Sequence, residues 1–309
     1  MQGILTTLPI VFIITLGWGL RHLGKIDGQE VSKVNSVLFW CIMPTILFRG
    51  GLDIDASVFF DGNYLTALYG SFVAVIALAL CTVRVLRFPQ KRGAVFVLGA
   101  IRSNVVFIGI PLVSVLLGDS GLRALYVYLS VGMLVYNSLP IACAQMVMEG
   151  HFSLRTVRNA LGRTIRTPLI IAGVLGILLS LTGLKDFLPG WFLQGIDLIA
   201  DAGSGLALIV IGASLQLRGL LRSLRTTWLL MGYKLILLPI VLTGAFWLFP
   251  PQDPLLGKVS ILIGGLSPAF NTFIMAAGME MDSEYAADYV ATSTVVGVAA
   301  AALWIEILF

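Results

Sequence analysis

Charged residues are scarce in this sequence. Only 12% of its 309 residues are Asp, Glu, Lys or Arg, whereas 58% are hydrophobic and the mean hydropathy is +0.96. Soluble domains carry about a quarter charged residues and rarely exceed half apolar. The composition therefore excludes an ordinary soluble domain and predicts an integral membrane protein. The net charge of +4 does not indicate a nucleic-acid partner, because the basic residues lie in short loops between apolar runs.

Residues that carry metal and acid–base chemistry are also few. The three cysteines, Cys41, Cys81 and Cys143, lie far apart inside apolar runs and form no C-x-x-C pair, so neither a disulfide framework nor a zinc site is expected. His22 and His151 lie in loops, and no apolar run holds an acid pair. We therefore expect no enzymatic activity, no metal and no cofactor. An intramembrane enzyme or a membrane sensor is left as a distant alternative.

Ten apolar stretches approach the length of about 20 residues that a membrane-spanning helix needs. They are 3–20, 34–48, 63–83, 94–117, 124–148, 168–184, 195–217, 227–249, 258–277 and 286–308. Inner loops are rich in Lys and Arg. With the N-terminus outside, the inner loops hold 14 of the 20 Lys and Arg residues and the outer loops hold 4. The sequence thus predicts an all-α polytopic membrane protein with ten transmembrane helices and both termini outside.

The inner loop 149–167 divides the ten stretches into two groups of five. An odd number of spans makes the second group enter the bilayer from the opposite side, which is the arrangement of an inverted repeat. The prediction is a first five-helix repeat at 1–148, a cytoplasmic linker with an amphipathic surface helix at 149–167, and a second five-helix repeat at 168–309.

The fourth stretch of each half is interrupted by polar residues. The run 98–118 carries Arg102-Ser103-Asn104, and the run 261–278 carries Ser267-Pro268 and then Asn271. A charged side chain at membrane depth costs several kcal/mol unless it faces protein or a water-filled cavity. Non-helical backbone is tolerated at that depth only in such places. Two interrupted spans at corresponding positions indicate the binding site of a secondary transporter.

The residues at the two breaks suit a small organic anion. A helix that restarts after a break points its free N–H groups and its positive dipole end at the gap. Asn104 and Asn271 can each donate an amide N–H to a carboxylate or accept from a hydroxyl, and the guanidinium group of Arg102 matches a carboxylate. Each has a structural alternative, since the arginine can bind carbonyls of its own half-helix and the amides can satisfy backbone that the breaks free.

Further polar residues beside these three complete the predicted substrate site. Ser103 and Ser267 precede the two restarts and are expected to act more as helix caps than as ligands. Pro268 has no N–H to leave unpaired and suits the first position of a helix. Tyr136 and Asn137 are polar at mid-depth in the fifth stretch, where they either line the pocket or pack inside the protein.

Four residues form a second line of candidates: Tyr136, whose place in the fifth stretch is given above, and Asn35, Pro44 and Lys234. Asn35 either caps the start of the second stretch or touches substrate, and Pro44 either kinks that stretch or reaches the pocket. Lys234 lies about eight residues into the eighth stretch, where its ammonium group is expected to snorkel to the inner interface rather than to serve transport.

Acidic residues are missing from the middle of every stretch. Asp288 and Glu306 lie near the ends of the last one. Proton-driven carriers usually place an acid in the pathway, so we expect transport without obligatory proton coupling. A sodium- or proton-coupled carboxylate symporter is the alternative, because carbonyls, hydroxyls and amides at breaks can also bind a cation.

The ordered set of motifs resembles the bacterial auxin efflux carrier family, which is related to plant PIN-type auxin carriers and to the crossed-helix fold of bile-acid symporters. The fourth stretch reads Ser-Asn-Val-Val-Phe-Ile-Gly-Ile-Pro-Leu over Ser103–Leu112, and the ninth reads Pro-Ala-Phe-Asn over Pro268–Asn271. Other matching positions are Asn35, Met43–Phe48, Gly212–Leu215, Lys234–Pro239 and Ser293-Thr294. Plant members have a proline where this chain has Ser103. The match is collinear over nearly the whole chain.

The resemblance implies a fold with two parts. Spans 1, 2, 6 and 7 would form a scaffold that holds a homodimer, and spans 3–5 and 8–10 would form a transport domain in which the broken fourth and ninth helices cross. Substrate would bind beside the crossing, and an elevator-like slide would give alternating access. Characterised relatives carry organic anions, namely auxin in plants and malate or malonate in bacteria, where the protein would lie in the inner membrane.

Overall fold

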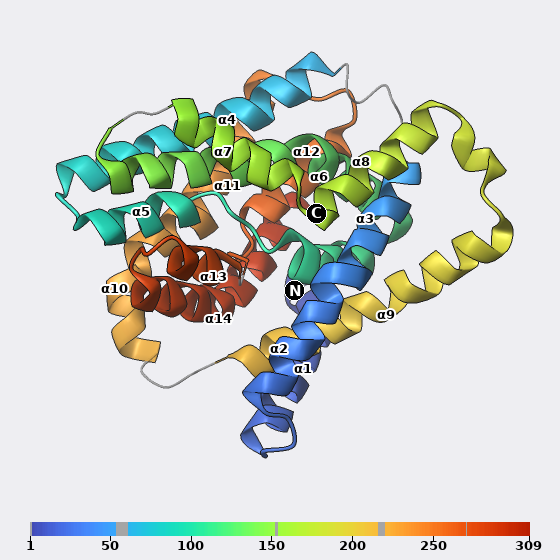
Figure 1. Cartoon of the computed structure of the whole chain (residues 1–309), viewed down its shortest axis with the longest axis horizontal. Coiled ribbons are helices and arrows are strands. Elements are labelled where there is room, and N and C mark those ends of the chain that lie inside the picture. Colours follow the sequence, from blue (N-terminus) through green and yellow to red (C-terminus); the bar gives the residue numbers. More distant parts are fainter. Residues whose placement is uncertain (1, 54–60, 152–153, 216–219, 270) are drawn as a thin grey trace.

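In the computed structural model of the chain, the described residues are 2–53, 61–151, 154–215, 220–269 and 271–309. All regular structure within these ranges is helical (Figure 1). The α-helices are α1 (Gln2–His22), α2 (Gly28–Val37), α3 (Met43–Leu52), α4 (Gly62–Val85), α5 (Gln90–Gly99), α6 (Ile110–Glu149), α7 (Leu154–Ile165), α8 (Pro168–Leu181), α9 (Gly190–Ser214), α10 (Leu220–Gly232), α11 (Leu238–Leu248), α12 (Pro254–Gly264), α13 (Asn271–Gly278) and α14 (Ser283–Leu308). Short π-helices η1 (Leu38–Ile42), η3 (Val105–Gly109) and η5 (Tyr233–Leu237) and the 3-10 helix η4 (Leu184–Phe187) join some of them.

Six helical segments of the described chain are long and apolar enough to cross a membrane. They are 28–52, 62–85, 105–149, 190–214, 220–248 and 283–308. Shorter apolar helices occupy 7–22, 168–181 and 254–264. These segments confirm a helical integral membrane protein, and the linker contains the expected helix, α7. The number of ten spans stays a prediction.

The longest helix, α6, is two rods joined at Gly118. This glycine has φ 59° and ψ −146°, a backbone conformation that a side chain strongly disfavours. The joint falls between the predicted stretches 94–117 and 124–148.

The second predicted stretch needs a correction at its start, because α2 begins at Gly28, six residues before the expected position 34.

Each of the three π-helical turns ends directly before a helix whose second residue is proline. The prolines are Pro44 after η1, Pro111 after η3 and Pro239 after η5. Proline lacks the N–H that an α-helix needs, and its ring clashes with the carbonyl four residues earlier. A widened turn before the proline relieves that clash, so the disturbance expected at Pro44 takes the form of a π-turn.

Close glycine contacts join α1 to α9 and α3 to α8. A Cβ on Gly17 would lie 2.1 Å from the carbonyl oxygen of Ile209, and one on Gly212 would lie 1.9 Å from that of Ile14. Gly176 of α8 approaches α3 in the same way. Small residues allow such close helix packing in membranes. Figure 1 shows these four helices together on one side, with α4, α5 and α10–α14 on the other.

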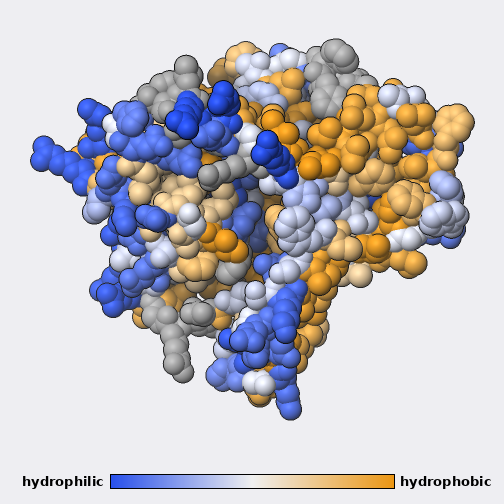
Figure 2. Space-filling model, in the orientation of Figure 1, coloured by the Kyte–Doolittle hydropathy of each residue, from blue (hydrophilic) through white to orange (hydrophobic). Residues whose placement is uncertain are grey.

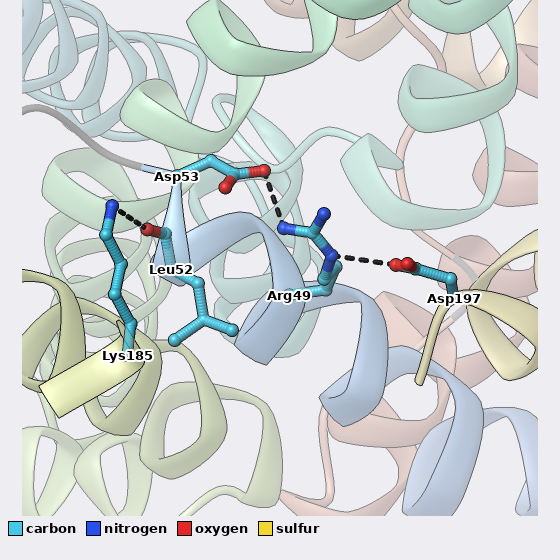
Figure 3. A network of polar contacts seen from close by, with 5 residues as sticks. All are labelled: Arg49, Leu52, Asp53, Lys185 and Asp197. Carbon is cyan, nitrogen blue, oxygen red and sulfur yellow. Dashed lines mark hydrogen bonds and ion pairs between the residues drawn. The ribbon is translucent and has the colours of Figure 1, made fainter. Parts of the chain in front are cut away.

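Arg49 near the end of α3 is the centre of a polar network (Figure 3). Its Nε lies 2.7 Å from a carboxylate oxygen of Asp197 on α9, and its Nη1 lies 2.7 Å from one of Asp53. The Nζ of Lys185 donates to the carbonyl of Leu52 at 3.2 Å. Arg49 belongs to the last turn of α3 and connects this helix with α9 through Asp197.

Candidate functional site

Two breaks in apolar helices meet at the centre of the molecule. The first lies between α5, which ends at Gly99, and η3, which begins at Val105. The second lies between α12, which ends at Gly264, and α13. The backbone N–H of Asn104 in the first break donates to the carbonyl of Ser267 in the second at 2.8 Å. The two predicted interruptions are therefore in direct contact.

Asn104 caps the restart after the first break. Its side-chain oxygen accepts a 3.2 Å bond from the backbone N–H of Phe107, and the residue is only 4% exposed. Ser103 was expected to be the cap, but its buried hydroxyl has no hydrogen-bond partner among the described residues. The expectation was wrong because Asn104, the residue directly before the restart, occupies the capping position.

Arg102 connects the first break with two helices. Its Nη1 donates to the side-chain oxygen of Asn137 on α6 at 2.8 Å, and its Nη2 donates to that of Asn271 on α13 at 2.9 Å. The arginine is 2% exposed and forms no ion pair with any described residue. The structure thus brings together three predicted residues: Arg102, which is a buried cation, and its two neutral amide partners, Asn137 and Asn271.

Lys234 is the second buried cation at the breaks. It is 0% exposed, and its Nζ donates to the carbonyl of Gly264, the last residue of α12. The prediction that this lysine snorkels to the interface was wrong. Distance along the chain from a span end does not reveal which side of the helix faces protein, and this side of η5 faces the second break.

Tyr136 belongs to an aromatic core instead of a pocket wall. It is 5% exposed, stacks on Tyr128 with ring centroids 6.2 Å apart, and meets Phe72 edge-on at 6.5 Å. Pro44 is the second residue of α3, after η1, and does not line the cavity described next. Of these two residues, neither reaches the open space beside the breaks.

A cavity of about 430 Å³ adjoins the breaks. Asn104 and Pro268, one from each break, lie in its wall together with Asn35 from α2. Asn35 was expected as a possible cap, but Asp27 caps α2 with bonds to the backbone N–H groups of residues 29 and 30. Among the described wall residues are others from α9, α10, α13 and α14, so the cavity lies between the two sides of the molecule. Figure 2 shows a hollow beside the polar α1–α2 end.

Two charged residues of the cavity wall were not among the predicted site residues. Arg21 lies in the last turn of α1, and Asp288 lies in the second turn of α14. Asp288 accepts a 2.7 Å bond from the hydroxyl of buried Ser223 on α10. The signal in the sequence was the carboxylate of Asp288 inside the last apolar stretch, 286–308, which also carries Glu306. Because Asp288 lies near the start of that stretch, the sequence did not reveal that α14 borders the cavity there.

The fold and the site together define a polytopic membrane transporter. The chain belongs to the family described as "Membrane transport protein", which matches residues 3–305 and is the auxin efflux carrier family that the motifs resemble. This result confirms the resemblance over nearly the whole chain.

Three curated relatives align with nearly their full lengths. An "Uncharacterized transporter" of Methanothermobacter thermautotrophicus is 22% identical over 306 residues, which are 98% of this chain and 97% of that protein. A "Putative malonate transporter" of Rhizobium meliloti is 23% identical over 296 residues, 94% and 91% of the two chains. "Uncharacterized transporter YfdV" of Escherichia coli K12 is 23% identical over 308 residues, 97% and 96%. All three names indicate transport.

Proposed function

We propose that this protein is a secondary transporter for a small organic anion, a carboxylate such as malonate, malate or an auxin-like acid. The observation that carries the proposal is the cavity of about 430 Å³ whose wall includes Asn104 and Pro268, one residue from each break. Arg102 and Lys234, two buried cations without carboxylate partners in the described chain, lie at the same breaks. Their positive charge favours an anion in the adjoining space.

The residues of the site would have different roles in binding the substrate. Asn104, in the cavity wall, would contact the carboxylate directly, and the N–H groups at the restart of the first broken helix would add to the attraction. Arg102 would act from behind the wall, where it holds Asn137 and Asn271. Ser103, Ser267 and Pro268 would shape the breaks. The name of the Rhizobium relative supports a dicarboxylate as the first substrate to test.

The architecture behind this function would be ten transmembrane helices in two inverted five-helix repeats, 1–148 and 168–309, joined by the linker 149–167. The contacts support it. The first span, α1, packs on the seventh, α9, and the sixth span, α8, packs on the second, α3. Span 1 corresponds to span 6 and span 7 to span 2, so exchanging the two halves turns the first pair into the second. Both pairs are close glycine contacts. The meeting of the two breaks lies between the halves, as helices that cross on a pseudo-twofold axis require.

Alternating access would come from an elevator-type movement. Spans 1, 2, 6 and 7 would form the scaffold and the remaining spans the moving domain, and the cavity lies between these two groups. The scaffold exposes apolar side chains of α8 and α9 (Figure 2), which suit lipid or the partner scaffold of a homodimer. With basic loops inside, both termini would face outward and the cavity would open to the cytoplasm in a bacterial inner membrane.

The first test is ligand-dependent thermal stability of the purified protein with malonate, malate, acetate and indole acetate. A ligand that binds only the folded state raises the unfolding temperature. Wild type should respond to at least one acid, and Asn104→Ala, Arg102→Ala and Asn271→Ala should lose the response while folded. Asn63→Ala is the matched control, because the Asn63 amide binds the carbonyl of Pro250 away from the breaks. Normal responses of all three variants would place the substrate elsewhere.

Proton-coupled transport is the one specific alternative to uncoupled transport. Asp288 lies in the cavity wall, so a proton-accepting group borders the proposed pathway after all. Proton flux accompanying substrate entry into proteoliposomes, abolished in Asp288→Asn, would establish a proton-coupled symporter. Substrate flux without proton flux, and unchanged in Asp288→Asn, would establish uncoupled transport down the anion gradient.

A further inference from the structure

The half-helices that end at the two breaks have their last carbonyls bound by buried side chains. The carbonyl of Gly99, at the end of α5, accepts a 3.0 Å bond from the hydroxyl of Tyr289 on α14. The carbonyl of Gly264, at the end of α12, accepts a bond from the ammonium group of Lys234. Both donors are 0% exposed. The two breaks therefore make the same contact, once with a neutral donor and once with a cation.

The comparison with Tyr289 shows that capping alone does not require a charge. Burying an ammonium group is costly unless it is compensated, and Lys234 is paired with no carboxylate in the described chain. What compensates it is the C-terminal end of α12, where the aligned peptide dipoles of the helix carry a partial negative charge. The second break is therefore a place at which the backbone favours a cation.

The segment that carries Lys234 is held firmly in this place. It lies in η5, whose carbonyl at Leu235 accepts a 2.9 Å bond from the indole N–H of Trp304 on α14. The same indole packs so closely on the second break that a Cβ on Gly265 would lie 2.6 Å from it. π-Helical turns inside α-helices are frequently found at functional sites.

Carriers with discontinuous helices coordinate their coupling cation with half-helix C-terminal ends and unwound carbonyls. We propose that the ammonium group of Lys234 permanently occupies such a cation site at the second break. The chain then needs no sodium ion there, and it holds a latent alkali-cation site that opens when this side chain is shortened. The consequence for coupling rests on the carrier function proposed above, whereas the site itself does not depend on the transported anion.

The test measures thermal unfolding of purified wild type and Lys234→Ser in sodium chloride and in choline chloride, without any organic acid. Wild type should unfold at the same temperature in both salts. Lys234→Ser should be less stable in choline and regain several degrees as sodium rises from about 10 to 300 mM, since the ion binds only the folded state. The serine hydroxyl and the carbonyl of Gly264 would be among its ligands.

Two controls separate a cation site from general salt effects. Lys234→Arg keeps a cation and should remain insensitive to sodium. Lys258→Ser removes an exposed lysine of the same helix α12, whose Nζ lies 5.2 Å from the ring centroid of Phe309, and should also be insensitive.

A sodium response of the wild type overturns the proposal, and so does a folded Lys234→Ser that ignores sodium. If Lys234→Ser folds only in sodium, the latent site is supported. If it folds in neither salt, the proposal is also overturned, because bound sodium should replace the lost contact. Failure of every carboxylate to stabilise wild type would remove the proposed substrate class and leave these outcomes unchanged.

Discussion

Arg49 and Arg102 are both helix-associated arginines with two side-chain partners, yet their surroundings are opposite. Arg49, at the edge of the molecule, lies 2.7 Å from each of two carboxylates, and its side chain is 32% exposed (Figure 3). Arg102, at the breaks, is 2% exposed and binds two neutral amide oxygens. The charge of Arg49 is neutralised by carboxylates at a place where water would already screen it. The charge of Arg102 has no carboxylate partner, at a place where nothing screens it.

The difference separates a structural role from a role in binding. A carboxylate beside an arginine satisfies its charge and leaves little attraction for a further anion. An amide oxygen satisfies the N–H groups and preserves the charge. The edge of the molecule at α3 and α9 is therefore held by ion pairs, while the breaks keep a positive potential that the proposed anionic substrate would use.

The largest effect is expected from Arg102→Met. This change removes the charge and leaves the amide oxygens of Asn137 and Asn271 without their donor, at about 1–3 kcal/mol each. Malonate uptake into proteoliposomes should fall to background while the variant still purifies as a folded protein. Uptake within threefold of wild type would show that the charge of Arg102 has no part in transport.

Asn137→Asp would convert Arg102 into a residue like Arg49. The oxygen that accepts from Nη1 at 2.8 Å would become part of a carboxylate, so the positive potential at the breaks would be cancelled with almost no change in shape. Uptake should fall at least tenfold. The contact with Arg102 is kept, but the bond that the Asn137 amide donates to the carbonyl of Met133 at 2.9 Å is lost, so the unfolding temperature should fall slightly. Asn137→Gln, which has no charge, is the control for altered length. A fully active Asn137→Asp contradicts the comparison.

Arg49→Met should have a smaller effect, on stability alone. Partly exposed ion pairs contribute about 0.2–1 kcal/mol each in double-mutant cycles, so the two pairs of Arg49 together should lower the unfolding free energy by roughly 1 kcal/mol. Uptake should remain within twofold of wild type. The cycle with Asp197→Asn, read by thermal unfolding, measures the pair itself. A loss of transport at unchanged stability would mean that this edge takes part in the movement.

The smallest effect is expected at Asp27, a charged residue outside the membrane-spanning segments. The backbone N–H of Glu30 donates to its carboxylate and lowers its pKa below the ordinary value of 3.8. A lowered pKa makes the ionised form stabilise the fold above pH 3.8, and this contribution disappears as the pH falls through the lower pKa of the folded protein. Asp27→Asn should therefore be slightly less stable than wild type at pH 7, with the difference shrinking on acidification. A difference that grows in acid contradicts this assignment.

Much of the site could be predicted because its signals are local. A charge, two asparagines and one proline inside apolar runs identify both breaks. The structure brings Arg102, Asn137 and Asn271 together and sets Asn104 and Pro268 in one cavity wall. These residues stand out because an apolar helix in a bilayer has no other use for them.

The features of the site that the sequence did not predict depend on packing between segments that are distant in sequence. Lys234 looked like a snorkelling lysine because its position along the span was known but the face it presents was not. Arg21 and Asp288 lie at helix ends and become cavity residues only because α1, α9, α10 and α14 converge there. Ser103 lost its expected capping role by a single residue of register, which lies within the uncertainty of any helix start read from sequence.

The glycine contacts between α1 and α9 also determine how long the first helix waits for its partner during synthesis. The backbone groove around Gly17 is complete as soon as α1 is made, whereas the surface that fills it, around Ile209, follows about 190 residues later. At about 5–20 residues per second, the first helix waits roughly 10–40 s for its partner. During that interval the first helix lacks the partner that its glycine face fits in the folded protein, and α10–α14 have not yet been made.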